Sequence, residues 1–114
     1  MPTQTAEQIA HPSRAEIRLA SVLHALSDPV RLRIVAALAG GDGEHTCSSF
    51  DVPVTKSTCT HHFRVLREAG VIRQRQEGTA RLNTLRRDDL EARFPGLLAT
   101  ILESASADLT GEAG

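Results

Sequence analysis

Apolar positions in the first third of the chain recur at the spacing of an amphipathic helix. We predict a first helix over residues 14–26, because Ser13 before it can accept hydrogen bonds from its first backbone amides. A second helix is predicted to begin at Pro29, since Asp28 can cap it and proline is favoured at the first helical position. This second helix is expected to end at the glycine pair that starts at Gly40.

The middle of the chain holds the strongest helical pattern. It predicts a helix that begins at Thr55 or Ser57 and ends at Gly70, because glycine is the usual residue just after a helix C-terminus. A short helix is expected earlier, over residues 46–50. The valines and proline that follow this short segment disfavour its continuation.

Alternating residues after the long helix predict two short strands, over residues 71–76 and 80–85. Residues 77–79 between them form a compact turn with a glycine where a positive φ is needed. Asp88 and Asp89 begin a helical segment, which Pro95 interrupts. We therefore expect a new helix over residues 95–106. Several helices and a two-stranded hairpin predict a mainly α fold, the winged helix-turn-helix.

The length of 114 residues fits one domain. We expect a disordered N-terminal arm over residues 1–12, a DNA-binding and dimerisation domain over residues 13–106, and a flexible tail over residues 107–114. Three Phe and no Trp or Tyr leave a thin core of small aliphatic residues. Because small cores give marginal stability, a second subunit would help.

The net charge of −1 conceals an asymmetry along the chain. Residues 56–87 hold eight basic and two acidic residues, whereas the remainder is acidic overall. This distribution predicts a basic functional surface on an otherwise acidic domain, an acidic body. A charged surface that meets only solvent is the alternative.

The long helix separates two kinds of residue on a helical wheel. Cys59, Phe63 and Leu66 fall on one side, with His62 beside them. The opposite side carries short hydroxyl side chains, which allow close approach to base edges, and arginine, which can bind guanine through two hydrogen bonds. This pattern predicts a recognition helix, with a merely solvated polar face as the alternative. The residues of this helix expected to contact DNA are Lys56, Ser57, Thr58, Thr60, His61, Arg64 and Arg67.

Arginines also line the predicted hairpin. Arg73 and Arg75 share one face of its first strand, and Arg81 opens the second strand. A hairpin of this kind predicts a wing that contacts DNA phosphates or enters the minor groove. Phosphate contact requires charge rather than shape, so it is the expected role of these three arginines with double-stranded DNA.

Two segments resemble the ArsR family of bacterial winged-helix repressors. Residues 24–34, with the sequence HALSDPVRLRI, look like the opening of that family's domain, and residues 57–70, STCTHHFRVLREAG, are similar to its recognition helix. The match continues through a Val-Ile pair and a Glu-Gly-Thr turn, and it covers roughly residues 14–105. The resemblance implies a homodimer joined through the first and last helices, a palindromic operator, and release by an inducer.

An apolar stripe on the last predicted helix agrees with the implied dimer. Leucine and isoleucine recur there, and the first helix offers a second stripe, which one small domain would struggle to cover. A purely intramolecular core is the alternative. The residues expected at the dimer interface are Leu19, Leu23, Leu97, Leu98, Ile101 and Leu102.

Candidate ligands for a sensed metal are few. Many metal-sensing relatives carry a Cys-x-Cys pair at the short third helix, and His45 and Cys47 lie near that place. His11 on the N-terminal arm could complete a site across the dimer for a divalent transition metal such as nickel or zinc. The last helix has no histidine, which departs from the family's other known metal site.

Cys47 and Cys59 are candidates for a thiol switch instead. Cys59 lies in the first turn of the long helix, where the helix dipole favours a thiolate. A disulfide between the two cysteines would distort the recognition helix, and it needs Cα atoms within about 7 Å. The alternative is that each thiol is a small buried apolar group.

No catalytic constellation or glycine-rich phosphate loop occurs, so we predict no enzyme. No apolar run reaches the roughly 18 residues of a transmembrane helix, and the start lacks a signal-peptide core, so a cytoplasmic location is expected. The predicted function is a DNA-binding repressor. The alternatives are a winged-helix module that binds protein, as the acidic body suggests, and a regulator that depends on an accessory regulator protein.

Overall fold

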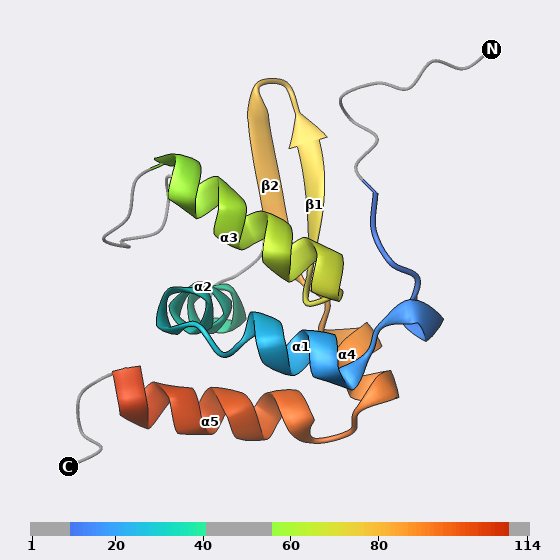
Figure 1. Ribbon diagram of the computed structural model, residues 1–114, viewed down its shortest axis with the longest axis vertical. Coiled ribbons are helices and arrows are strands. Elements are labelled where there is room, and N and C mark those ends of the chain that lie inside the picture. Colours follow the sequence, from blue (N-terminus) through green and yellow to red (C-terminus); the bar gives the residue numbers. More distant parts are fainter. Residues whose placement is uncertain (1–9, 41–55, 110–114) are drawn as a thin grey trace.

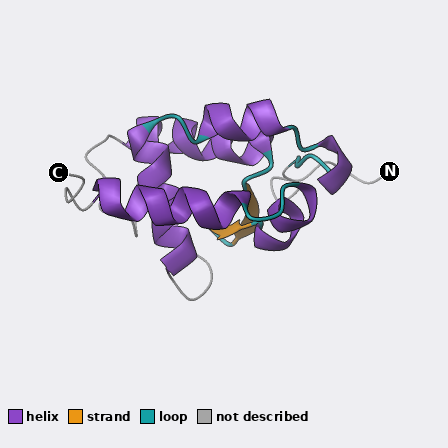
Figure 2. Ribbon diagram, turned by 90° about the horizontal axis from the view of Figure 1, so that it is seen from below, coloured by secondary structure: helices purple, strands orange, loops and turns teal. Residues whose placement is uncertain are grey.

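The computed structural model describes residues 10–40 and 56–109. In chain order, the elements are η1 (Arg14–Glu16), α1 (Leu19–Ala25), α2 (Pro29–Gly40), α3 (Lys56–Ala69), β1 (Ile72–Glu77), β2 (Ala80–Leu85), α4 (Arg87–Arg93) and α5 (Leu97–Leu109). α3 and the hairpin lie at one end of the molecule, α5 lies across the other, and α1 and α2 lie between them (Figure 1). Seen from the α5 side, the hairpin is almost hidden behind the helices (Figure 2). The predicted winged helix-turn-helix fold is confirmed, and the short helix expected over residues 46–50 lies outside the described residues.

The prediction of one helix over residues 14–26 is wrong, because the chain is extended at Ile17 and Arg18. A 3-10 turn, η1, therefore precedes a shorter helix, α1. The break turns Ile17 into the core, where it is 1% exposed. Its carbonyl oxygen accepts hydrogen bonds from Nε and Nη2 of Arg93 in α4, which replace the lost helical bond. Packing outweighs local helix propensity at this point.

α2 begins as predicted. Oδ1 of Asp28 accepts hydrogen bonds from the backbone amides of Val30 (2.8 Å) and Arg31 (3.2 Å), and Pro29 occupies the first helical position. Asp28 therefore satisfies two of the amides that a helix N-terminus leaves without a partner.

α3 ends in a Schellman motif. Gly70 has a φ of 88°, and its amide donates to the carbonyl of Arg67 (3.0 Å). The amide of Val71 donates to the carbonyl of Leu66 (2.9 Å), and both of these apolar side chains are fully buried. This turn fixes the direction in which the chain leaves α3 for β1.

The hairpin also follows its prediction, with β1 shifted by one residue. β1 and β2 are antiparallel, and the last pair before the loop is Glu77 opposite Ala80. Gly78 and Thr79 form the loop, and Gly78 has a φ of 62°, which suits glycine at the first position of a two-residue hairpin turn.

A single core cluster draws side chains from α1, α2, α3, β1, α4 and α5. α4 and α5 separate at Pro95 and Gly96, as the proline predicted. The largest fully buried side chains are Ile17, Ile34, Leu66, Ile72, Val22, Val35, Val71 and Asn83. Asn83 is the polar member of this set. Within the described part of the chain, no helix has the length and apolar character needed to cross a membrane.

Candidate nucleic-acid interface

One face of α3 is buried and the other is exposed, as the sequence predicts. Cys59 and Phe63 are each 2% exposed, and Leu66 is fully buried. The exposed residues described on this helix are Thr58, Thr60, His61, Arg64 and Glu68. The side chains of Lys56 and Ser57 lie outside the part that the structure describes. Hydroxyl, imidazole and guanidinium groups therefore share an open surface above an apolar flank.

Arg64 is the most accessible cation described on α3. Its side chain is 65% exposed, and its Nε lies 3.7 Å from a carboxylate oxygen of Glu68, which is 62% exposed. An exposed pair of this kind contributes only a few tenths of a kcal/mol. Arg64 can therefore exchange this partner for a base or a phosphate.

Arg67 differs from the other predicted contact residues of α3. Its side chain is 15% exposed, and its Nη1 donates a hydrogen bond to Oε1 of Gln74 in β1 (3.0 Å). α3 and β1 cover most of its guanidinium, so Arg67 joins these two elements rather than extending from the surface.

The hairpin carries arginines on both faces. Arg73 and Arg75 share one face, as predicted, and their side chains are 54% and 50% exposed. Arg81 lies opposite Gln76 in the register, so it is on the other face. That face turns toward α3, because Gln74 on it binds α3.

Asp89 of α4 gathers three arginines at the base of the hairpin. Its carboxylate accepts hydrogen bonds from Arg14 (2.8 Å), Arg86 (2.8 Å) and Arg73 (3.4 Å). The bond from Arg14, together with Arg86, outweighs burial and holds the pKa of Asp89 below its ordinary value. Nη1 of Arg86 also donates to the carbonyl of Pro12 (2.8 Å), which ties down the N-terminal segment. Arg73 is therefore partly neutralised, and Arg75, nearer the tip of the wing, forms an exposed ion pair with Glu77 (3.2 Å).

A buried histidine of α3 fixes this helix on α2. His62 is 7% exposed, and its Nδ1 lies 3.1 Å from Nη1 of Arg31, itself 8% exposed. Burial, with smaller contributions from Arg31 and His61, lowers the pKa of His62 against the opposing effect of Asp28. His62 is at the edge of the core, as its wheel position predicted, but no local pattern marked Arg31 as its partner.

The residues predicted at a dimer interface divide into three groups by exposure. Leu19 and Leu23 of α1 are 44% and 46% exposed, although both are large and apolar. The partly buried members are Leu97, Ile101 and Leu102. Leu98 is only 7% exposed, since α5 turns it into the core of its own subunit, and its prediction as an interface residue is corrected.

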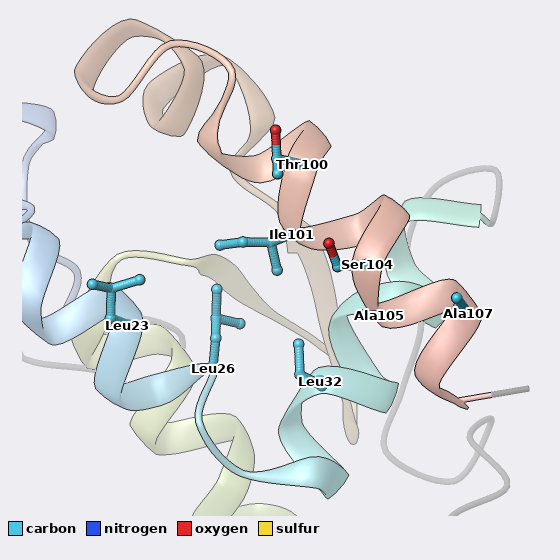
Figure 3. A pocket seen from close by; sticks show the side chains of 8 residues that line it. All are labelled: Leu23, Leu26, Leu32, Thr100, Ile101, Ser104, Ala105 and Ala107. Atoms are coloured by element: carbon cyan, nitrogen blue, oxygen red, sulfur yellow. The ribbon is translucent and has the colours of Figure 1, made fainter. Parts of the chain in front are cut away.

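A groove of about 490 Å³ lies between α1, α2 and α5. Figure 3 shows the groove with Leu23 of α1, Leu26 just after it and Leu32 of α2 on one side. Ile101 and Ser104 of α5 lie on the other side. Most of its lining is apolar. Exposed Leu23 of α1 therefore borders an apolar groove beside α5, the helix that lies on the side of the molecule away from α3 (Figure 1).

The candidate sensor residues are only partly described. His45 and Cys47 lie outside the described residues, and Nε2 of His11 accepts a hydrogen bond from the amide of Gln74 (2.9 Å). Cys59 is disulfide-bonded, and the sequence contains one other cysteine, Cys47. Among the residues that the structure describes, no three His, Cys, Asp or Glu side chains gather as metal ligands. The metal site stays a prediction.

Comparisons with known proteins decide the family. A family model described as a helix-turn-helix domain matches residues 26–75. The HTH-type transcriptional regulator YceK of Bacillus subtilis is 33% identical over 84 residues, which cover 72% of this chain and 84% of that protein. The ArsR-like transcriptional regulator from Rhodococcus sp. RHA1 is 25% identical with a TM-score of 0.57, over 83% of this chain and 92% of its own. The chain belongs to the ArsR family of transcriptional regulators.

The fold is also similar to that of Rv0081 from M. tuberculosis, which is 26% identical with a TM-score of 0.60 over 83% of this chain and 92% of its own. The named relatives of this ArsR-family chain are transcriptional regulators and not enzymes, as the sequence predicted. The chain is thus a transcriptional regulator with a helix-turn-helix DNA-binding domain.

Proposed function

We propose that this ArsR-family chain is a cytoplasmic repressor that binds a palindromic operator as a homodimer. The observation that carries the proposal is the open face of α3, where Thr60, His61 and Arg64 are exposed above a buried flank. Repression then follows from occupancy, because a dimer bound over a promoter excludes other proteins from the same DNA.

Each exposed group suits a feature of duplex DNA. The second helix of a helix-turn-helix lies in the major groove, with its N-terminal residues nearest the base edges. Thr60 and His61 occupy the first half of α3, and Arg64 follows one turn later, where a guanidinium can bind O6 and N7 of guanine. Arg75 and Arg81 of the wing supply positive charge for phosphates.

The test begins with selection of duplexes from a random pool by the purified chain. We expect Arg64→Ala to lower affinity for the selected duplex by about 5- to 150-fold and to change affinity for random duplex much less. Arg33→Ala removes an exposed arginine of α2 and is the matched control, with little effect on either DNA. Equal loss on both DNAs would contradict base recognition by Arg64. Failure to enrich any sequence would favour a module that binds protein.

The proposed dimer uses the side of the subunit away from α3. Leu19, Leu23 and the apolar groove beside α5 form an area that a second copy can cover with its own α1 and α5. A two-fold dimer with α3 exposed on both subunits would set two recognition helices about 34 Å apart, in successive major grooves. The two-fold symmetry of such a dimer is why we propose a palindromic operator.

We also propose that thiol oxidation, rather than a metal, is the signal. The supporting observation is the disulfide bond of Cys59, which lies within the buried flank of α3 and next to exposed Thr60. Reduction would alter packing directly under the face that binds DNA. By contrast, Nε2 of His11, a candidate metal ligand, already accepts a hydrogen bond.

DNA affinity after treatment with dithiothreitol or with diamide tests this signal. We expect the two forms to differ by about 5- to 150-fold, the range of ordinary allosteric coupling, and Cys59→Ser to abolish the difference. Equal affinity of the oxidised and reduced forms would contradict the proposal. Nickel or zinc found in the purified protein, with DNA affinity that changes on its removal, would favour metal sensing.

A further inference from the structure

A series of buried polar groups joins α3 to both strands of the wing. Nη1 of Arg67 donates a hydrogen bond to Oε1 of Gln74 (3.0 Å), and Nε2 of Gln74 donates one to Oδ1 of Asn83 (2.8 Å). Gln74 and Asn83 lie opposite each other in the register and are 6% and 1% exposed. A polar cross-strand pair therefore occupies a position in the interior of the hairpin's α3-facing side.

Stability alone does not account for this pair. Ile72 and Leu85, the pair on the same face two positions away, pack there with apolar side chains. Burial of polar atoms is unfavourable unless each is hydrogen-bonded, and Nε of Arg67 is buried without a hydrogen-bond partner in the described part of the chain. The strength of a hydrogen bond depends on the angle between donor and acceptor, whereas apolar contact is non-directional. Hydrogen bonds can therefore fix the orientation of the hairpin on α3.

The orientation of the wing relative to α3 matters because the hairpin is long. It leaves α3 at Gly70, and its tip at Gly78 lies about 23–26 Å away at about 3.3 Å per residue. A rotation of about 10° at this junction would move the tip by about 4 Å, which exceeds the length of a hydrogen bond. Gln74 lies partway along the hairpin, so its bond to Arg67 opposes this rotation.

The backbone of Gln74 is held from the other edge of β1. Its amide donates a hydrogen bond to Nε2 of His11 (2.9 Å), on the side that β2 does not cover. Pro12, next along the chain, is in turn bound by Arg86. Gln74 is thus fixed through its side chain by α3 and β2, and through its backbone by the N-terminal segment.

We propose that Arg67, Gln74 and Asn83 are positioning residues that hold the wing at the angle at which Arg75 and Arg81 reach the duplex bound by α3. The inference rests on the proposed function, because it requires α3 and the wing to bind one DNA site. Gln74 is its centre, since it bonds to both of the other residues. Arg67 then contributes to DNA binding through the wing rather than through a contact of its own.

The test is a double-mutant cycle between Gln74→Leu and Arg75→Ala. Its readout is the salt dependence of affinity for a duplex that the wild-type chain selects from a random pool. Arg75→Ala alone should make the plot of log affinity against log salt less steep, reducing the magnitude of its negative slope by about 1 per subunit. Gln74→Leu alone should lower it by about 2, because Arg75 and Arg81 both lose their phosphates. In the Gln74→Leu background, Arg75→Ala should change the slope hardly at all.

Two further variants separate positioning from folding. Gln76→Leu lies on the same strand and face, but Gln76 bonds to the carbonyl of Gly78 and to Nε of Arg81 within the hairpin and not to α3. Arg75→Ala should therefore keep its full effect in that background. Arg67→Met combined with Gln74→Leu and Asn83→Leu replaces all three polar side chains by apolar ones. This triple variant should melt near the wild-type temperature and still show the lowered slope.

The outcomes distinguish this inference from the function on which it rests. A full effect of Arg75→Ala in the Gln74→Leu background would overturn the positioning role, even if Arg64→Ala weakens binding as expected. If Arg64→Ala leaves binding of the selected duplex unchanged, the proposed role of α3 fails instead. A triple variant that folds and retains the wild-type slope would also overturn the inference.

Discussion

Nη1 of Arg31 donates a hydrogen bond to Nδ1 of His62 (3.1 Å) and thereby ties α2 to α3. The guanidinium has donors only and stays protonated, so Nδ1 must be the acceptor and His62 must be neutral. Nε of Arg31 donates to the carbonyl of Ala25 (2.6 Å), which fixes the guanidinium in place. Protonation of His62 would replace this bond by repulsion between two cations.

We predict that the protein loses stability as the pH falls below about 6.5. Burial keeps the pKa of His62 in the folded chain below its ordinary value, so the unfolded chain takes up this proton first. The stabilisation from neutral His62 is therefore complete above the ordinary pKa and is lost as the pH falls toward the folded one. Thermal unfolding between pH 7.5 and 5.5 measures the effect.

The control for this prediction is His62→Asn, which keeps an acceptor near Nδ1 and does not titrate. The other charged groups that face this site are Asp28, Arg31 and His61, and they remain in the variant. The melting temperature should fall less with pH in the variant than in the wild type. Equal falls would show that His62 does not carry the effect.

Gly70 should tolerate no side chain. A Cβ at this position would lie 2.6 Å from Cγ1 of Ile17, and the φ of 88° is itself unfavourable for other residues. We predict that Gly70→Ala lowers the free energy of unfolding by about 2–4 kcal/mol, as measured in urea. Gly78→Ala is the matched control: its φ is also positive, but a Cβ there meets nothing within 4 Å, so its cost is about 1 kcal/mol. Similar losses in both variants would mean that the contact with Ile17 is unimportant.

Asp89→Asn should destabilise the base of the wing. The variant removes a charge that pairs with Arg86, whose side chain is only 4% exposed, and with more exposed Arg14. A buried cation left without its carboxylate costs on the order of 2 kcal/mol. Asp88→Asn, on the neighbouring exposed residue, should change stability by less than about 0.5 kcal/mol. Equal stability of the two variants in urea would exclude a structural role for the Asp89 cluster.

Replacement of Leu19 and Leu23 by Gln should dissociate the proposed dimer. Each leucine is a little under half exposed in the subunit, so each substitution loses about 0.7 kcal/mol or more of burial per subunit. Over both positions and both subunits, the dimer dissociation constant should rise at least about a hundredfold. Sedimentation equilibrium gives the constant, and circular dichroism should show an unchanged helical content. Leu98→Ala, a substitution in the subunit core, should lower the melting temperature instead. A wild-type chain that sediments as a monomer would refute the proposed dimer.

Several features of the fold follow from local sequence signals. Asp28 and Pro29 start α2, and Gly70 ends α3 because the left-handed conformation there favours glycine. The spacing of Cys59 and Phe63 also predicts which flank of α3 is buried and therefore which flank is open. All of these signals act within one helical turn or one hairpin.

The sequence by itself determined where most elements begin and end, and which face of α3 carries the groups that suit DNA. Only the tertiary structure decided that Ile17 leaves its helix, that Arg67 turns to Gln74, and that Leu98 belongs to the core. These outcomes depend on neighbours distant in sequence, as between Ile17 and Arg93, which are 76 positions apart. Periodicity shows that a face will be covered, but the packing of the whole chain determines what covers it.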